Sequence, residues 1–170
     1  MRLAQEGLVA SDGSHRGVVV FQASPQDLDE LYEIRIALEP LAARLATPRV
    51  SELDIDALQQ VIDEMRATDD SATREALNRQ FHSQIYRFAD RDRLSSIIDQ
   101  LRDASTVYMR FLSVRWGSLG YRAAADDEHQ AIVDALRRRD ADAAADTTAA
   151  HLEHTRGHIL TALSDLAAQA

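Results

Sequence analysis

A chain of 170 residues with 45% hydrophobic content is long enough to bury one sizeable core. The formal net charge of -9 argues against a surface that wraps nucleic acid unaided, because duplex affinity depends largely on cations that neutralise phosphates. Cysteine is absent, which excludes disulfides and thiolate metal sites, and no apolar run approaches the roughly 20 residues that cross a bilayer. We therefore expect a cytoplasmic protein without a membrane segment, in which nitrogen and oxygen atoms would hold any metal.

The first 24 residues differ in character from the rest of the chain. Two short β-prone runs, 8–10 and 17–21, flank the dipeptide Asp12-Gly13, and this arrangement is a strong hairpin signal. An isolated two-stranded hairpin is marginally stable unless it packs on something else. We therefore predict that residues 1–24 are a piece of a larger unit and that residues 25–170 form a separate helical domain.

From Pro25 onward the pattern predicts helix with few interruptions. Ser24 precedes the first helix, which should stop near Thr47 because a residue followed by proline is pushed out of the α region. Ser51 begins a near capping box, and Asp70 or Ser71 can cap the third helix. The expected helices span about 26–46, 51–68, 70–90, 92–114, 119–138 and 140–167. Short connections between six helices predict an all-α antiparallel bundle, preceded by the hairpin.

An arginine lies on the apolar stripe of the first predicted helix. The apolar members of this stripe follow 3,4 spacing and are Leu28, Leu31, Leu38, Ala42 and Leu45. Arg35 shares their face, and a guanidinium on the core side needs an anionic or polar partner because an unpaired buried charge is too costly. One interpretation is an internal salt bridge with Glu39 or Asp103. The other is that Arg35 binds a carboxylate ligand, which its fork of donors suits.

Three of the six histidines fall on inward-facing stripes of different predicted helices. His129 lies at the centre of its stripe and His151 at the edge of another, while His82 flanks a third. Asn78 precedes His82 by four residues, so both side chains leave the same helix face one turn apart. A single inward histidine is more often a hydrogen-bonded core residue than a ligand. Three of them together with an asparagine shift the balance toward a site for one metal ion and leave both interpretations open.

A series of short motifs along the helical part is far more specific than any one of them. The motifs are Leu31-Tyr32-Glu33-Ile34-Arg35 with Leu38-Glu39, Asn78-Arg79-Gln80-Phe81-His82, Glu128-His129-Gln130-Ala131-Ile132, Asp140 with Ala143-Ala144, and His151-Leu152. This pattern, over about residues 25–163, resembles the FadR-type branch of the GntR superfamily of bacterial transcription regulators. It looks in particular like their C-terminal effector-binding and dimerisation domain, called FCD.

The resemblance implies an all-helical pocket that holds a divalent cation through three histidines and an Asp or Asn. Carried over residue by residue, these ligands are Asn78, His82, His129 and His151. Imidazole and carbonyl ligands suit first-row cations, of which we expect zinc or nickel. Asn78 stands where many members have Asp, so this ligand brings no charge. The resemblance further implies that the carboxylate of a small organic acid completes the site and meets Arg35.

Weaker candidates for effector contacts lie on the fourth predicted helix, where Tyr108 is on the inner stripe and Arg115 is near the end. For Tyr108 an ordinary core position is the preferred interpretation. The family resemblance implies a homodimer in which effector binding changes the relation of two protomers. Such coupling requires unequal affinity for the two arrangements and is typically worth ~1–3 kcal/mol.

The N-terminal piece resembles the end of a recognition helix and the wing of a winged helix-turn-helix. The resemblance rests on residues 2–9 and on Arg16-Gly17 with the valines that follow, and it implies operator contacts from Arg16 and Gly17. The two preceding helices of such a reader are absent from this sequence, so a helix cannot be presented to the major groove in the usual manner. We expect weak or no DNA binding by this chain alone. A fragment, a mis-assigned start and a natural loss are all compatible with this pattern.

Two other classes of function would use the same residues. A metal-dependent hydrolase can activate water at an open cation site, but the chain has no HExxH motif and no adjacent His-Asp pair, so we expect no enzyme. A helical interaction module with purely structural histidines would carry no stoichiometric metal. A ferritin-like di-iron site would need paired Glu-x-x-His motifs. His154 and His158 form a competing pair at helical spacing, but on a wetter face.

Overall fold

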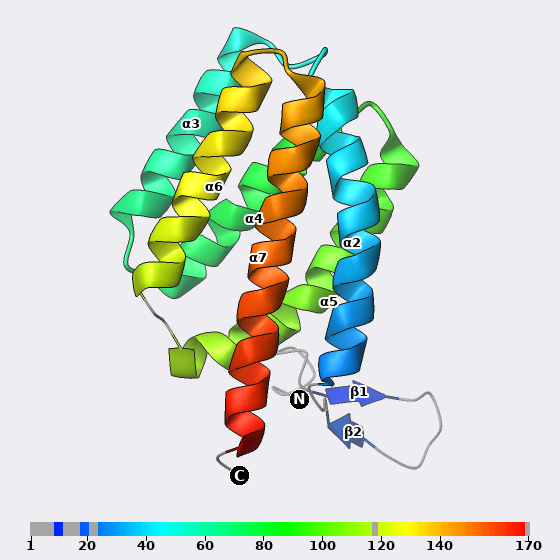
Figure 1. Cartoon of the computed structure of the whole chain (residues 1–170), viewed down its shortest axis with the longest axis vertical. Helices are drawn as coiled ribbons and strands as arrows, with labels where there is room; N and C mark the ends of the chain where they lie inside the picture. Colours follow the sequence, from blue (N-terminus) through cyan, green and yellow to red (C-terminus); the bar gives the residue numbers. More distant parts are fainter. Residues whose placement is uncertain (1–8, 12–17, 21–23, 117–118, 169–170) are drawn as a thin grey trace.

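The computed structural model describes residues 9–11, 18–20, 24–116 and 119–168, with the backbone alone at 9–11, 18–20, 107, 109–116, 119–120 and 166–167. Six helices make up most of this described part (Figure 1). They are α2 (Pro25–Ala46), α3 (Glu52–Ala67), α4 (Ser71–Arg87), α5 (Asp92–Trp116), α6 (Leu119–Arg137) and α7 (Ala141–Ala168). The predicted all-α bundle is confirmed, and the predicted helix limits lie within a few residues of the observed ones. No described helix combines the length and the apolar character that a membrane span needs.

Two short strands precede the bundle, at the two runs that the sequence marks as β-prone. Strand β1 (Val9–Ser11) pairs antiparallel with β2 (Val18–Val20), and Val9 lies opposite Val20. Arg16 and Gly17 lie outside the described residues. Their contacts to DNA, the origin of this segment as a winged-helix remnant and the division of the chain after residue 24 therefore stay predictions.

The predicted helix caps form in the structure. The Ser51 hydroxyl accepts from the Asp54 N–H at 3.2 Å, while the Asp54 carboxylate accepts from the Ser51 N–H at 2.8 Å. This capping box satisfies amide donors at the start of α3 that have no partner within the helix. The Asp70 carboxylate accepts from the Thr73 N–H at 2.8 Å and caps α4 in the same way, and Ser24 caps α2. Local sequence therefore sets where these helices begin.

The end of α2 lies where the sequence predicts it, but for a different reason. Thr47 keeps right-handed helical angles, with φ -47° and ψ -47°, and its N–H donates to the Ala43 carbonyl at 3.1 Å. The expected exclusion of this residue from the α region was wrong. The helix ends because Pro48 has no N–H to continue the ladder. Pro40 lies inside the same helix and removes one further hydrogen bond there.

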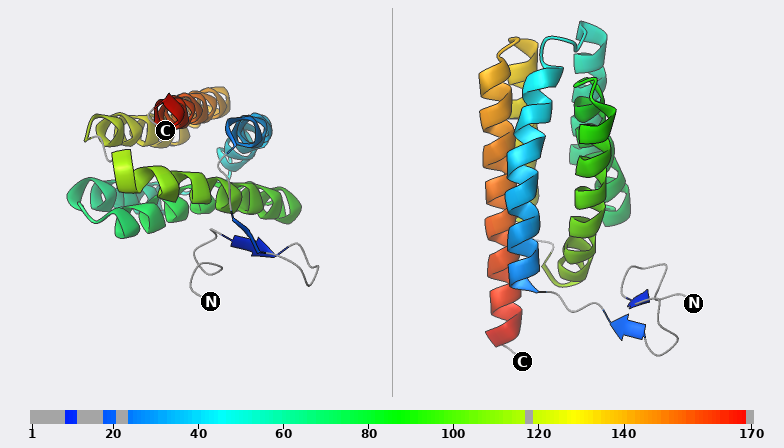
Figure 2. Two further views of the ribbon diagram at one scale, coloured as in Figure 1. Left: turned by 90° about the horizontal axis from the view of Figure 1, so that it is seen from below. Right: turned by 90° about the vertical axis from the view of Figure 1, so that its right-hand side faces the viewer.

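The core consists of two apolar clusters that share α2 and α7, which run side by side (Figures 1 and 2). One cluster includes Ala42 of α2, and the other includes Leu28 and Tyr32 of the same helix. Along the buried face of α2, Arg35 and Glu39 fall between these two sets. The boundary between the apolar clusters is therefore filled by buried polar side chains, and the candidate site lies there.

Candidate metal centre

Three histidines from three helices meet in the interior. His82 of α4, His129 of α6 and His151 of α7 each expose 6% or less of their surface, and one ring nitrogen of each lies within 4.8 Å of the others. The ring centroids are separated by 4.7 to 5.2 Å. Two metal–nitrogen bonds of ~2.0–2.1 Å span at most about 4 Å, so these nitrogens lie close to the separation that one shared ion requires. The structure thus brings together three of the four predicted ligands.

Several ring nitrogens in this group have no partner. Nε2 of His82 and both ring nitrogens of His129 are buried without a hydrogen bond among the described residues. Phe81 packs against both rings, at centroid distances of 5.1 Å to His82 and 4.8 Å to His129. Buried polar atoms are normally satisfied, because desolvating them without a partner is costly. A cation that takes up these lone pairs would remove this cost, so the residues fit a metal ion.

Neighbouring groups orient two of the rings. The Tyr86 hydroxyl donates to Glu39 Oε2 at 2.5 Å, so its oxygen is left to accept from Nδ1 of His82 at 3.2 Å. Nδ1 of His151 donates to Glu128 Oε2 at 2.8 Å. With Nδ1 protonated, each ring keeps the lone pair on Nε2, which is the arrangement that metal-ligating histidines usually have.

The surroundings also keep two of the imidazoles neutral. Burial lowers the pKa of His82 well below its ordinary value of 6.5, and the nearby positive charge of Arg102 lowers it further. Burial lowers the pKa of His129 in the same way, with added effects from His151 and Arg102. Because a ligating imidazole must be deprotonated, these shifts favour the form that binds metal.

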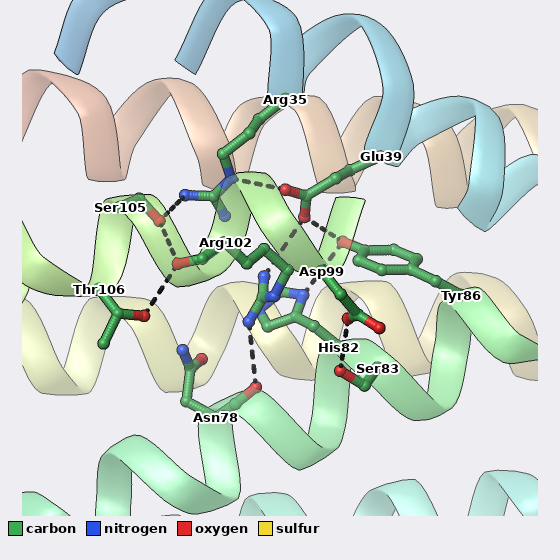
Figure 3. Close-up of polar contacts among 10 residues, drawn as sticks. All are labelled: Arg35, Glu39, Asn78, His82, Ser83, Tyr86, Asp99, Arg102, Ser105 and Thr106. Carbon is green, nitrogen blue, oxygen red and sulfur yellow. Dashed lines mark hydrogen bonds and ion pairs between the residues drawn. The ribbon is translucent and has the colours of Figure 1, made fainter. Parts of the chain in front are cut away.

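Asn78, the fourth predicted ligand, lies one turn before His82 on α4. Its partly buried side chain leaves α4 on the same side as the His82 ring (Figure 3). Its backbone carbonyl accepts a long hydrogen bond of 3.5 Å from Arg102. The structure therefore places Asn78 beside the α4 histidine, and its role as a ligand stays a prediction.

A second group of buried polar residues, which we call the Glu39 cluster, adjoins the histidines (Figure 3). Its members are Arg35, Glu39, Tyr86, Arg102 and Ser105. Arg35 donates from Nε to Glu39 Oε1 at 2.6 Å and from a terminal nitrogen to the Ser105 hydroxyl at 2.9 Å. Arg102 donates to Glu39 Oε2 at 3.3 Å. Burial opposes ionisation of Glu39, but the charges of Arg35 and Arg102 outweigh it and hold the pKa of this carboxyl below its ordinary value.

Of the two interpretations of Arg35, the internal salt bridge with Glu39 is confirmed. Asp103, the other partner considered, instead pairs with Arg79 on the surface. Tyr108 is buried in the apolar cluster that contains Tyr32, as the core interpretation predicts. The side chain of Arg115 lies outside the described residues.

The competing pair, His154 and His158, lies outside the group of three buried histidines. His154 is exposed and contacts the second oxygen of Glu128 through Nδ1 at 2.5 Å. His158 stacks on the ring of Tyr121 at a centroid distance of 4.0 Å. His154 is thus exposed and His158 partly buried, so this pair is less enclosed than the three buried histidines, as the sequence predicts.

Three functional candidates were missed by the sequence analysis, namely Tyr86, Glu128 and Arg102. Tyr86 follows His82 by four residues, so helical spacing could have found it. Arg102 follows the buried Ile98 by the same interval. Glu128 carries no such signal, because its contact with His151 depends on how α6 and α7 pack.

Comparison with known proteins gives a consistent result. The sequence profile of the FCD domain matches residues 30–154. The chain is 24% identical over 168 residues to the uncharacterized HTH-type transcriptional regulator YdhC of Bacillus subtilis, covering 96% of this chain and 73% of YdhC. The structure is similar to E. coli McbR/YncC, with a TM-score of 0.81, 20% identity, and coverage of 93% of this chain and 79% of that one. It is also similar to the metal-free FCD domain of TM0439, with a TM-score of 0.70, 16% identity, and coverage of 85% and 99%. At these identities the two solved structures establish the shared fold.

Proposed function

Because the chain belongs to the FCD family, the effector-binding domain of GntR-type transcription regulators, we propose that it senses a small organic acid through a bound divalent cation. The relatives that it matches are transcription regulators rather than enzymes. The observation that carries the proposal is the convergence of His82, His129 and His151 in the core. The unsatisfied ring nitrogens and lowered pKa values of His82 and His129 support a ligand role over a purely structural one.

The proposed cation is zinc or nickel. Neutral imidazoles suit both metals, and the side-chain oxygen of Asn78 would serve as a fourth ligand from α4. When bound, the cation would supply a Lewis-acid anchor for a carboxylate oxygen. Tyr86 and Glu128 would hold the His82 and His151 rings with their Nε2 lone pairs free for it.

The role of Arg35 in this proposal differs from the one that the family resemblance implies. Its Nε and one terminal nitrogen donate to Glu39 and Ser105, so an effector that took up these donors would have to break a buried ion pair. Breaking such a pair is strongly unfavourable. Arg35 therefore serves in the proposal to hold Glu39 in place, and Arg115 stays a predicted contributor to the pocket.

The regulatory part of the proposal rests on the family. Residues 25–170 would form the effector-binding domain of a homodimer, and residues 1–24 would belong to its DNA reader, with Arg16 and Gly17 near the operator. An effector can shift the equilibrium between two protomer arrangements only by binding them with unequal affinity.

Elemental analysis of the untagged protein tests the metal site. We expect about one zinc or nickel ion per chain, and loss of that ion in His129→Ala. His154→Ala is the matched control, because this histidine is exposed and should leave the metal content unchanged. Absence of stoichiometric metal in the wild type would favour a helical interaction module instead.

A thermal-shift screen of small carboxylates, with and without chelator, tests effector binding. A ligand at about 100 times its dissociation constant should add roughly 2.7 kcal/mol to the free energy of unfolding. We expect this stabilisation to disappear with chelator and in His129→Ala. A carboxylate response that persists without metal would contradict the proposed anchor, and chelator-sensitive hydrolysis of esters would revive the hydrolase alternative.

A further inference from the structure

The Glu39 cluster carries more positive than negative charge. Two guanidiniums, those of Arg35 and Arg102, face the one carboxylate of Glu39. The remaining members are neutral, since burial raises the pKa of Tyr86 well above its ordinary value and Ser105 does not ionise. The cluster thus holds one excess positive charge inside the protein. A buried charge without a counter-ion is costly, so such an excess points to a missing anion.

The two arginines are not equally satisfied. Arg35 makes short contacts of 2.6 Å to Glu39 and 2.9 Å to Ser105. Arg102 is farther from Glu39, at 3.3 Å, and reaches the Asn78 carbonyl only at 3.5 Å. Its Nε is buried and has no hydrogen-bond partner in the described part of the chain. Water cannot readily supply one, because only 8% of the side chain is exposed. Arg102 is therefore the guanidinium that lacks a full set of acceptors.

Arg102 also lies next to the histidine triad. It contacts the backbone of Asn78, one helical turn from His82, and Figure 3 shows its guanidinium over α4 among these residues. Its charge acts on both His82 and His129. An anion bound by the proposed cation would consequently lie within the field of Arg102 as well.

On the basis of the proposed function, we propose that Arg102 is the anion-binding side chain of the effector site and that the effector carries two carboxylates. One carboxylate would bind the cation, and the other would bind the donors of Arg102. The ligands contributed by His82, His129, His151 and Asn78 are neutral in this site. A divalent cation beside the cluster therefore brings two positive charges next to the one in excess. The Glu128 carboxylate at His151 offsets one of these three charges. A dicarboxylate offsets the remaining two, whereas a monocarboxylate offsets one of them, and a guanidinium fork is suited to a carboxylate.

Arg102→Met tests this assignment without leaving a stranded charge. The substitution removes the excess cation and leaves Arg35 and Glu39 as a balanced pair, so the variant should fold. Arg79→Met is the matched control, since it removes the same charge from an exposed position on α4 that pairs with Asp103. Arg102→Lys keeps the charge but lacks the fork.

Binding is measured by titration calorimetry on the zinc-loaded full chain. The probes are malonate, succinate and glutarate, each paired with the monocarboxylate of equal carbon number, namely propionate, butyrate and pentanoate. We expect at least one dicarboxylate to bind the wild type at least tenfold more tightly than its partner. Arg102→Met should weaken that dicarboxylate roughly 10- to 100-fold, the usual range for loss of a hydrogen bond to a charged group. Binding of the monocarboxylate should change less than about twofold, and Arg102→Lys should fall between the wild type and Arg102→Met.

The possible failures are distinguishable. If acids bind the zinc-loaded protein but no dicarboxylate exceeds its partner, the inference is overturned while the proposed function stands. The same holds if Arg102→Met weakens both members of a pair equally, since that would indicate a general structural role. If the chain takes up no zinc, or no acid of either series binds, the proposed function fails and the inference fails with it.

Discussion

Glu39→Gln is the substitution whose effect on stability follows most directly from the structure. The Glu39 side chain is fully buried and is the shared acceptor for Arg35 at 2.6 Å, Arg102 at 3.3 Å and the Tyr86 hydroxyl at 2.5 Å. An amide of the same size fills the same space but leaves two guanidiniums in the core without a counter-charge. Loss of one partner from a buried ion pair costs about 3–5 kcal/mol. This is a large part of the roughly 5–15 kcal/mol that stabilises a typical domain.

The assay is chemical and thermal unfolding in the presence of chelator, so that metal binding does not add to the measured free energy. At roughly 2–4 °C per kcal/mol for a chain of this size, Glu39→Gln should lower Tm by about 6–20 °C. Arg102→Met should leave Tm unchanged or slightly raised, because it leaves the Arg35–Glu39 pair balanced. If Glu39→Gln proves as mild as Arg102→Met, the charge assignment of the cluster is wrong.

The difference in stability between the wild type and Glu39→Gln should also depend on pH in a defined way. The folded-state pKa of Glu39 lies below the ordinary value of 4.5, since the two arginines outweigh the effect of burial. A lowered pKa means that the carboxylate contributes its full stabilisation above about pH 4.5 and loses it as the pH falls through the folded-state pKa. The difference in stability between the wild type and Glu39→Gln should therefore be constant near neutral pH and shrink in acid. A difference that grows on acidification would contradict this.

Three further outcomes are expected. Tyr86→Phe removes the oxygen that accepts from His82 Nδ1, so a competitive zinc indicator should report metal binding about 10- to 100-fold weaker, and unchanged affinity would show that Tyr86 does not orient this ring. Glu128→Gln removes the carboxylate that accepts from His151, so it should weaken metal binding by a similar factor. X-ray absorption would compare the histidine ligands of the bound metal in this variant and in the wild type. The free energy of unfolding of the metal-free protein should be constant above about pH 6.5 and fall as the pH drops below that value. The pKa values of His82 and His129 are lowered in the folded state, so below pH 6.5 these two histidines take up protons in the unfolded chain but not in the folded one. A flat stability profile between pH 7 and 5 would contradict burial of these rings as neutral imidazoles.

Controls for these outcomes lie on the same helices. His154→Gln removes the exposed partner of Glu128 and should leave metal affinity within about twofold of the wild type, because the contact between Glu128 and His151 persists. Ser83→Ala lies next to His82 but bonds to Asp99 instead, so it should leave metal binding unchanged. Equal losses in these controls and in Tyr86→Phe would indicate a general loss of packing.

Local sequence was enough to predict where the helices lie and which faces they bury. Ser51 and Asp70 act as caps through atoms at most three residues away, so no tertiary information is needed to place them. Helical phasing likewise predicted that His82, His129 and Arg35 point inward, because the period of the helix determines which side chains share a face. These are short-range properties of the chain, and they are visible in the sequence.

The partners across helices were decided by the tertiary structure alone. Arg35 and Glu39 lie four residues apart on α2, so helical spacing offered this pair, although Asp103 stayed open as the other partner. Phasing gave no sign that Arg102 of α5 shares the same carboxylate. The contact of Glu128 with His151 also joins separate helices. Such contacts depend on the axial shift and rotation of one helix against another, which arise from packing of the whole core and have no local sequence period. The residues that can bind a cation were thus foreseeable, whereas the charge that surrounds it was set only by how the helices pack.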